Sequence, residues 1–155
     1  MSPTLQLDLK QKKPFRSLQQ EAYLSIVRTS TSLTDAMEDL MKARGISATQ
    51  YNVLRILRGS GAEGLCRNEL RDRMLTRMPD MTRLLDRMEG AGLVVRAREG
   101  DDRRMVMTRI TEKGRRLLDE LDTPVMALHR KQMAGLTDAQ LRSLSDLLTL
   151  VRDGG

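Results

Sequence analysis

The chain has 155 residues, of which 39% are apolar; this suits one globular domain with its own core and excludes global disorder. The single cysteine, Cys66, excludes an intrachain disulfide framework and favours a cytoplasmic location, and no apolar run approaches the roughly 18 residues of a membrane span. Only 2% of the residues are aromatic, which argues against base stacking on single-stranded nucleic acid. The net charge of +6 lies mostly in residues 65–116 and indicates either a polyanionic partner or a solvated charged surface.

The N-terminal third of the chain predicts an arm followed by two helices. Residues 1–16 combine alternating leucines with a basic cluster, and we expect a flexible arm or an extended strap there. Apolar residues at roughly helical spacing then predict a long helix over residues 17–44. A capping box formed by Ser47 and Gln50 predicts the start of a second, largely buried helix that ends near Gly59.

Two short helices are predicted next. The stretch GLCRNELRDRML indicates a short polar helix, and TRMPDMTRLLDRMEG indicates another. Pro79 fits the first turn of the latter, because its missing N–H has no helical partner there, and Asp80 suits the positive end of the helix dipole. An i, i+3, i+4, i+7 pattern defines its buried face, made of Met81, Leu84, Leu85 and Met88. The opposite face carries Thr82, Arg83 and Arg87.

A β-hairpin and two further helices complete the predicted elements. LVVRAR and residues 105–110 read as two strands joined by a charged turn. Thr111 then caps a helix that Pro124 is expected to kink or interrupt. A second capping box, Thr137 with Gln140, opens the last helix.

This order of elements predicts a mainly α fold with a small β-hairpin wing. Two short helices separated by a tight turn form a helix-turn-helix, and the hairpin behind them makes it a winged helix. A helix fits the major groove of DNA, where exposed side chains meet base edges. The hairpin tip lies one phosphate backbone away, and a narrow minor groove attracts arginine.

Two motifs resemble the MarR family of bacterial transcription regulators. GDDRRMVMTRITEKG is similar to the family's wing signature of Asp-x-Arg, five residues, Leu or Ile followed by Thr, two residues and Gly; the matching residues are Asp102, Arg104, Ile110, Thr111 and Gly114. MTRLLDRMEGAGLVVR resembles the recognition helix and the first wing strand. The resemblance covers residues 18–151. Pro79 departs from the pattern, because many members have a small polar residue there and proline removes one backbone donor.

The resemblance implies a set of DNA-binding residues. Thr82 and Arg83 would face the major groove, and Arg87 would contact a phosphate or a base edge. Arg104 would enter the minor groove, held by Asp102 through a charge-assisted hydrogen bond. The remaining residues would lie near or contact the phosphate backbone: Arg77, Asp80, Arg98 and Arg103. Each arginine could instead be a solvated surface residue or the partner of a nearby aspartate.

The resemblance also implies a homodimer that responds to an effector. Residues 17–45 and 112–155 would form a helical dimerisation region around a winged helix-turn-helix domain at 46–111, with four candidate contact residues, Leu141, Leu144, Leu148 and Val151. Two copies would bind a palindromic double-stranded operator. Members of the family commonly release DNA when a small, often aromatic ligand binds, so a repressor with a small aromatic effector is expected, although an activator is not excluded.

Two other classes of function remain as alternatives. An enzyme is disfavoured, because one histidine, His129, and one cysteine lie far apart, and no metal-ligand cluster, phosphate loop or cofactor fingerprint is visible. We therefore expect no cofactor and no metal.

Cys66 could act as a redox sensor beside Arg67, but it lies outside the N-terminal helix that carries the cysteine of redox-sensing relatives. A winged helix that binds only proteins is distinguished by a DNA affinity without a steep salt dependence.

Overall fold

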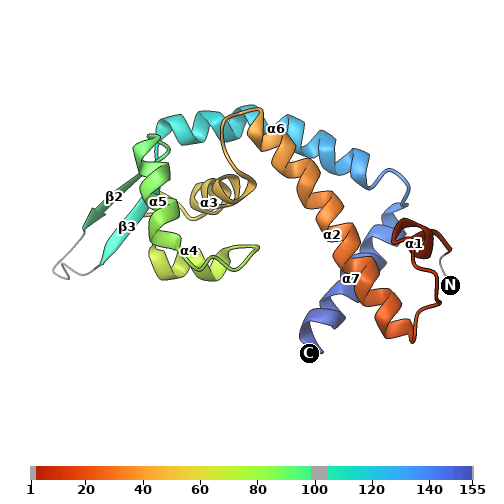
Figure 1. Cartoon of the computed structure of the whole chain (residues 1–155). Coiled ribbons are helices and arrows are strands. Elements are labelled where there is room, and N and C mark those ends of the chain that lie inside the picture. Colours follow the sequence, from red (N-terminus) through yellow and green to blue (C-terminus); the bar gives the residue numbers. More distant parts are fainter. Residues whose placement is uncertain (1–2, 99–104, 155) are drawn as a thin grey trace.

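The computed structural model describes residues 3–98 and 105–154 (Figure 1). Within these ranges the elements in chain order are α1 (Pro3–Asp8), α2 (Leu18–Lys42), α3 (Ala48–Gly59), β1 (Leu65–Cys66), α4 (Arg67–Arg73), α5 (Met81–Gly90), β2 (Val94–Arg98), β3 (Val106–Ile110), α6 (Glu112–Gln132) and α7 (Asp138–Asp153). The chain is mainly helical with one small antiparallel sheet, as the sequence predicted. In Figure 1, α6 runs from the sheet to the far end of the molecule, where α2, α7 and α1 gather.

The sheet has one more strand than the sequence predicted. Its order is β1-β3-β2, and β1 is a two-residue strand in which Leu65 pairs with Thr108 and Cys66 with Met107. The predicted hairpin is present as β2 and β3, which pair antiparallel from Val94 opposite Ile110 onward. The prediction of a two-stranded wing was therefore incomplete, because β1 is too short to show any alternation of apolar residues.

The core joins the helix-turn-helix to the long C-terminal helix. Buried apolar side chains come from the end of α2, from α3, α4 and α5, from β2 and from α6; the most deeply buried include Met41, Leu54, Leu57, Leu70, Leu85, Met88, Leu118 and Leu121. The predicted face of α5 is confirmed, with Met81, Leu85 and Met88 buried and Leu84 packed against the core. Burying that face fixes which side of α5 points outward.

Three local predictions differ from the structure. Residues 3–8 form a helix in which Leu5 is only 8% exposed, rather than a flexible arm or an extended strap. Pro79 precedes the N-cap Asp80 and so lies outside the first turn of α5, where its missing N–H removes no donor. Of the two effects expected of Pro124, a kink or an interruption, the interruption is wrong, because α6 continues from Glu112 to Gln132 with buried residues on both sides of the proline.

A bidentate ion pair ties α3 to α6. Arg58 donates from both terminal nitrogens to Asp122, over 2.9 and 2.7 Å, and also to Asp119 over 3.2 Å. The hydrogen bonds from Arg58 lower the pKa of Asp122 below its ordinary value. Both side chains are partly exposed, 30% for Arg58 and 49% for Asp122, so solvent weakens the pair.

The pair predicts an acid-sensitive contribution to stability. Because the folded-state pKa of Asp122 is lowered, the contribution is complete above the unfolded value of about 3.9 and is lost as the pH falls through the folded-state pKa. We expect Asp122→Asn to lower the free energy of unfolding by about 0.5–1 kcal/mol at pH 7 and by nearly nothing near pH 2. Urea titrations at both pH values measure this, and a difference that is independent of pH would contradict it.

Candidate nucleic-acid interface

The outer face of α5 presents the side chains that the sequence assigned to the major groove. Thr82, Arg83 and Arg87 are all exposed, while the opposite face of the helix packs on the core. Within the described ranges neither arginine takes part in an ion pair, so the alternative in which a nearby aspartate neutralises them finds no support there. These guanidinium groups are available to an incoming acceptor.

Asp80 sets the start of α5. Its carboxylate accepts the backbone N–H of Arg83 over 3.0 Å and caps the helix. An aspartate cap satisfies one of the unpaired donors of the first turn and favours the positive end of the dipole. Asp80 therefore places Arg83 on the outer face by fixing where the helix begins.

A hydrogen bond to α3 holds the turn before α5 in place. Asn52 is buried in α3, and its Oδ1 accepts the backbone N–H of Leu75 over 2.9 Å. Arg77 follows in the same turn and is exposed. Arg77, which is expected to lie near the phosphate backbone of DNA, is therefore on a segment that the core holds in place.

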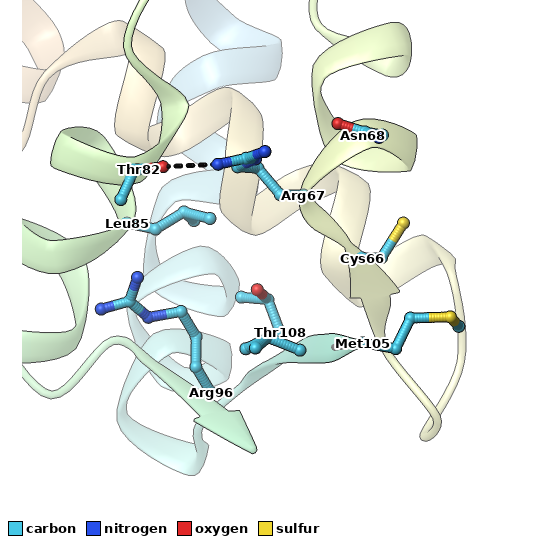
Figure 2. Close-up of a pocket in the computed structure, with 9 residues that line it drawn as sticks. Cys66, Arg67, Asn68, Thr82, Leu85, Arg96, Met105 and Thr108 are labelled. Carbon is cyan, nitrogen blue, oxygen red and sulfur yellow. Dashed lines mark hydrogen bonds between the residues drawn. The ribbon is translucent and has the colours of Figure 1, made fainter. Parts of the chain in front are cut away.

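Arg67 lies beside the outer face of α5, and the sequence analysis did not assign it to the DNA-binding site. It is the first residue of α4, and its guanidinium donates to Thr82 Oγ1 over 3.0 Å (Figure 2). Both side chains are exposed. The hydrogen bond joins the two helices of the helix-turn-helix on their outer side.

Arg96 fixes α5 against the wing. Its guanidinium pairs with Asp86 and, over 3.0 Å, with Glu89, while its backbone N–H donates to Glu89 over 2.9 Å. The hydrogen bonds from Arg96 lower the pKa of Glu89. The Arg96 side chain is only 21% exposed, so both acidic groups of α5 are drawn toward the sheet and away from the outer face.

A hollow of about 340 Å³ lies between α4, α5 and the sheet (Figure 2). Its lining includes Cys66, Arg67, Thr82, Arg96, Met105 and Thr108. Cys66 is half-buried there, and its backbone N–H donates to Glu69 over 2.8 Å, which lowers the pKa of that carboxyl. The acidic groups near the hollow are engaged, since Glu69 accepts from Cys66, and Asp86 and Glu89 pair with Arg96.

The wing is described up to its last paired residues. Arg98 ends β2, opposite Val106, and its side chain is exposed. The predicted minor-groove arginine Arg104, with Asp102 and Arg103, lies outside the described residues. The roles expected for these three residues stay predictions.

The second half of the wing signature serves the junction between β3 and α6. Thr111 caps α6 by accepting the Gly114 backbone N–H over 3.1 Å, and its hydroxyl donates to the Gly92 carbonyl over 2.6 Å. A Cβ on Gly114 would come within 2.6 Å of the Leu93 carbonyl oxygen. Threonine and glycine at these positions therefore hold the end of the wing against the long helix.

An apolar surface lies at the opposite end of the molecule from the sheet. On α7, Leu147 and Val151 are 60% and 61% exposed, and Leu144 and Leu150 are exposed beside them. Of the other predicted dimer residues, Leu141 and Leu148 are half-buried. The same end of α2 exposes Leu18, Tyr23, Ile26 and Val27. We call these α2 and α7 side chains the apolar end surface.

The described ranges contain no group of three or more histidine, cysteine, aspartate or glutamate side chains that could hold a metal ion. Nor, within those ranges, is any helix sufficiently long and apolar to cross a membrane. The lone histidine, His129, is exposed on α6.

Comparisons with known proteins identify regulators that share this arrangement. A family model described as the MarR family matches residues 44–105, which lie between α2 and β3. The chain is 28% identical to the HTH-type transcriptional repressor IacR of Pseudomonas putida over 126 residues, which cover 81% of this chain and 74% of IacR.

Solved structures agree with this likeness. The crystal structure of a MarR transcription factor from Planctomyces limnophilus is 39% identical, covers 88% of this chain and 99% of its own, and superposes with a TM-score of 0.68. CouR from Rhodococcus jostii RHA1, solved bound to p-coumaroyl-CoA, is 27% identical with a TM-score of 0.73 and covers 88% of this chain and 95% of its own.

Proposed function

Because this chain belongs to the MarR family of transcriptional regulators, we propose that it is a repressor that binds a palindromic double-stranded operator as a homodimer and is released by a small aromatic effector. The relatives are transcriptional regulators and not enzymes. The observation that carries the proposal is the outer face of α5, where Arg83 and Arg87 are exposed on a helix whose inner face is locked into the core.

Sequence-specific binding is proposed to come from α5 in the major groove. A guanidinium group can donate two hydrogen bonds to O6 and N7 of guanine, and each such pair discriminates by about 1–3 kcal/mol. Arg83 lies in the first turn of α5, which is the part of a recognition helix that meets base edges. Arg87 follows one turn later and is assigned to a base edge or a phosphate.

The apolar end surface supports the homodimer. Contiguous exposed apolar patches on a globular protein commonly mark an interface. Two copies joined there would each present one α5, and half-sites about 34–36 Å apart would bring both helices onto one face of the duplex. A palindrome follows, because a two-fold dimer reads the same sequence twice.

Repression with release by an effector rests on the relatives. IacR is named a repressor, and CouR was solved with an aromatic acyl thioester bound. An effector that favours a different separation of the two α5 helices lowers operator affinity, typically with about 1–3 kcal/mol of coupling. Screening aromatic acids and phenols for release of bound DNA would identify the compound class.

Binding of the purified protein to its own promoter region tests the proposal directly. Fluorescence anisotropy across a salt series, with a scrambled duplex as control, separates sequence preference from phosphate attraction. We expect preferential and steeply salt-dependent binding. Equal weak binding to both duplexes would contradict the operator, and no binding at low salt would favour a protein-interaction module.

Arg83→Ala is expected to relax sequence preference. The variant loses its base contacts, so the ratio of operator to scrambled affinity should fall by about tenfold or more while non-specific binding changes little. Competition binding of wild type and variant to both duplexes measures this ratio. Uniform weakening on both duplexes would instead show that Arg83 contacts phosphate.

A further inference from the structure

The hydrogen bond between Arg67 and Thr82 links two exposed side chains that have no structural need of each other. Arg67 is the first residue of α4, and Thr82 is the second of α5. Both helices already contribute a buried side chain to the core, Leu70 from α4 and Leu85 from α5. The 3.0 Å bond between Arg67 Nη1 and Thr82 Oγ1 therefore lies on the outer side, where it orients the guanidinium group rather than completing the core.

The pair presents mainly donors to solvent. Thr82 Oγ1 accepts one hydrogen bond from Arg67 and keeps its own hydrogen and one lone pair, and four of the five guanidinium N–H groups remain after this bond. The nearby acids are engaged, since Glu69 accepts from Cys66 and Asp80 accepts from Arg83. Within the described residues Arg67 takes part in no ion pair, so the group that complements this surface is an anion made of acceptors.

We propose that Arg67, oriented by Thr82, binds one backbone phosphate in each half-site of the operator, at the edge of the major groove. The inference rests on the proposed function and adds a residue to it. A phosphate is favoured over a base, because the first helix of a helix-turn-helix crosses the backbone while the second enters the groove. The planar guanidinium matches two phosphate oxygens at once, which a lysine ammonium does not.

The proposal changes the role of Thr82. The sequence analysis placed it on the groove-facing side of the helix beside Arg83. In the structure its oxygen accepts from Arg67, and we assign it as the positioning residue that keeps the Arg67 fork in place. The pair then contributes affinity and register without sequence information, whereas Arg83 contributes sequence preference.

Arg67→Ala in the full-length protein tests the phosphate contact. We expect operator and scrambled affinities to fall by the same factor, about tenfold at low salt. The magnitude of the slope of log affinity against log salt should fall by about 1.8, because each of the two protomers loses one phosphate contact worth about 0.9. Arg67→Lys should keep most of the slope and lose part of the affinity. Arg142→Ala, which removes one exposed arginine from α7, is the charge-matched control and should leave the slope unchanged.

A double-mutant cycle tests the positioning role of Thr82. Thr82→Val removes the oxygen and Thr82→Ser keeps it, so the loss caused by Arg67→Ala should shrink to about threefold in the valine background and stay about tenfold in the serine background. Equal losses in both backgrounds would overturn the positioning role.

The outcomes separate this inference from the proposed function. If wild type prefers its operator but Arg67→Ala changes neither affinity nor salt slope, the phosphate contact is wrong and the regulator stands. If Arg67→Ala reduces sequence preference, Arg67 reads a base and the proposal is likewise wrong. If wild type shows steep salt dependence without sequence preference, the proposed operator binding is wrong. The change in salt slope caused by Arg67→Ala still tests the phosphate contact in that case.

Discussion

Replacing Gly64 with alanine is expected to lower the free energy of unfolding by about 3 kcal/mol, a large loss for a single added methyl group. Gly64 has φ of +75°, and its Cβ would lie 2.9 Å from the carbonyl carbon of Thr108 and closer still to that carbonyl oxygen. These are backbone atoms of β3, which pairs with Leu65 at this point. They cannot move away without opening the ladder between β1 and β3.

Gly61 provides the matched control. It also has a left-handed backbone, with φ of +89°, but a Cβ there meets nothing within 4 Å. Gly61→Ala should therefore cost only the conformational strain, about 1 kcal/mol. Urea denaturation followed by circular dichroism compares the two variants. Equal losses at the two positions would show that the approach of Gly64 to Thr108 is unimportant.

Placing two charges on the apolar end surface is expected to abolish the dimer and with it most of the operator affinity. Leu147 and Val151 lie one turn apart on α7 and are both more than half exposed, so Leu147→Glu with Val151→Glu leaves the monomer core intact. In a dimer the two carboxylates would lose water at the interface. Losing the second half-site should lower operator affinity by about 10²-fold or more.

The control for this pair lies on the other side of the same helix. Ser145→Glu with Thr149→Glu adds the same charges with the same spacing, and both residues are exposed. Sedimentation velocity gives the oligomeric state, and anisotropy gives the affinity. A double variant at Leu147 and Val151 that stays dimeric would place the interface elsewhere. A wild-type protein that is monomeric at micromolar concentration would contradict the homodimer itself.

The sequence was informative wherever a local rule decides the structure. The capping boxes at Ser47 and Thr137 mark helix starts in the structure, and the apolar period of α5 identified its buried face. These features depend on residues within one or two turns of each other. The outward direction of Arg83 followed from the same period, because a helix with one side buried has its other side fixed.

Contacts between distant segments were not predictable in the same way. Strand β1 exists because it pairs with β3, which follows it by about 40 residues, and two residues carry no pattern of their own. Arg96 was read as part of a strand, since nothing in the sequence tells that its guanidinium turns back to Asp86 and Glu89 on α5. Arg67 was missed likewise, because its partner Thr82 is on another helix. Pro79 was predicted to lie in the first turn of α5, but the N-cap is Asp80, so the helix begins after the proline.

The ion pairs of Arg96 make α5 and the wing a single lever arm. With β2 tied to two acidic residues of α5, tilting α5 independently of the strand beside it would break these contacts. Any movement that adjusts this unit to DNA then involves α6, the long helix that connects the unit to the far end of the molecule. For the proposed dimer on a palindrome, spacing between half-sites, rather than groove shape within one, would become the geometric variable that affects binding. Inserting one base pair between the half-sites would displace one arm by about 3.4 Å and rotate it around the duplex, a misalignment that a rigid arm transmits in full.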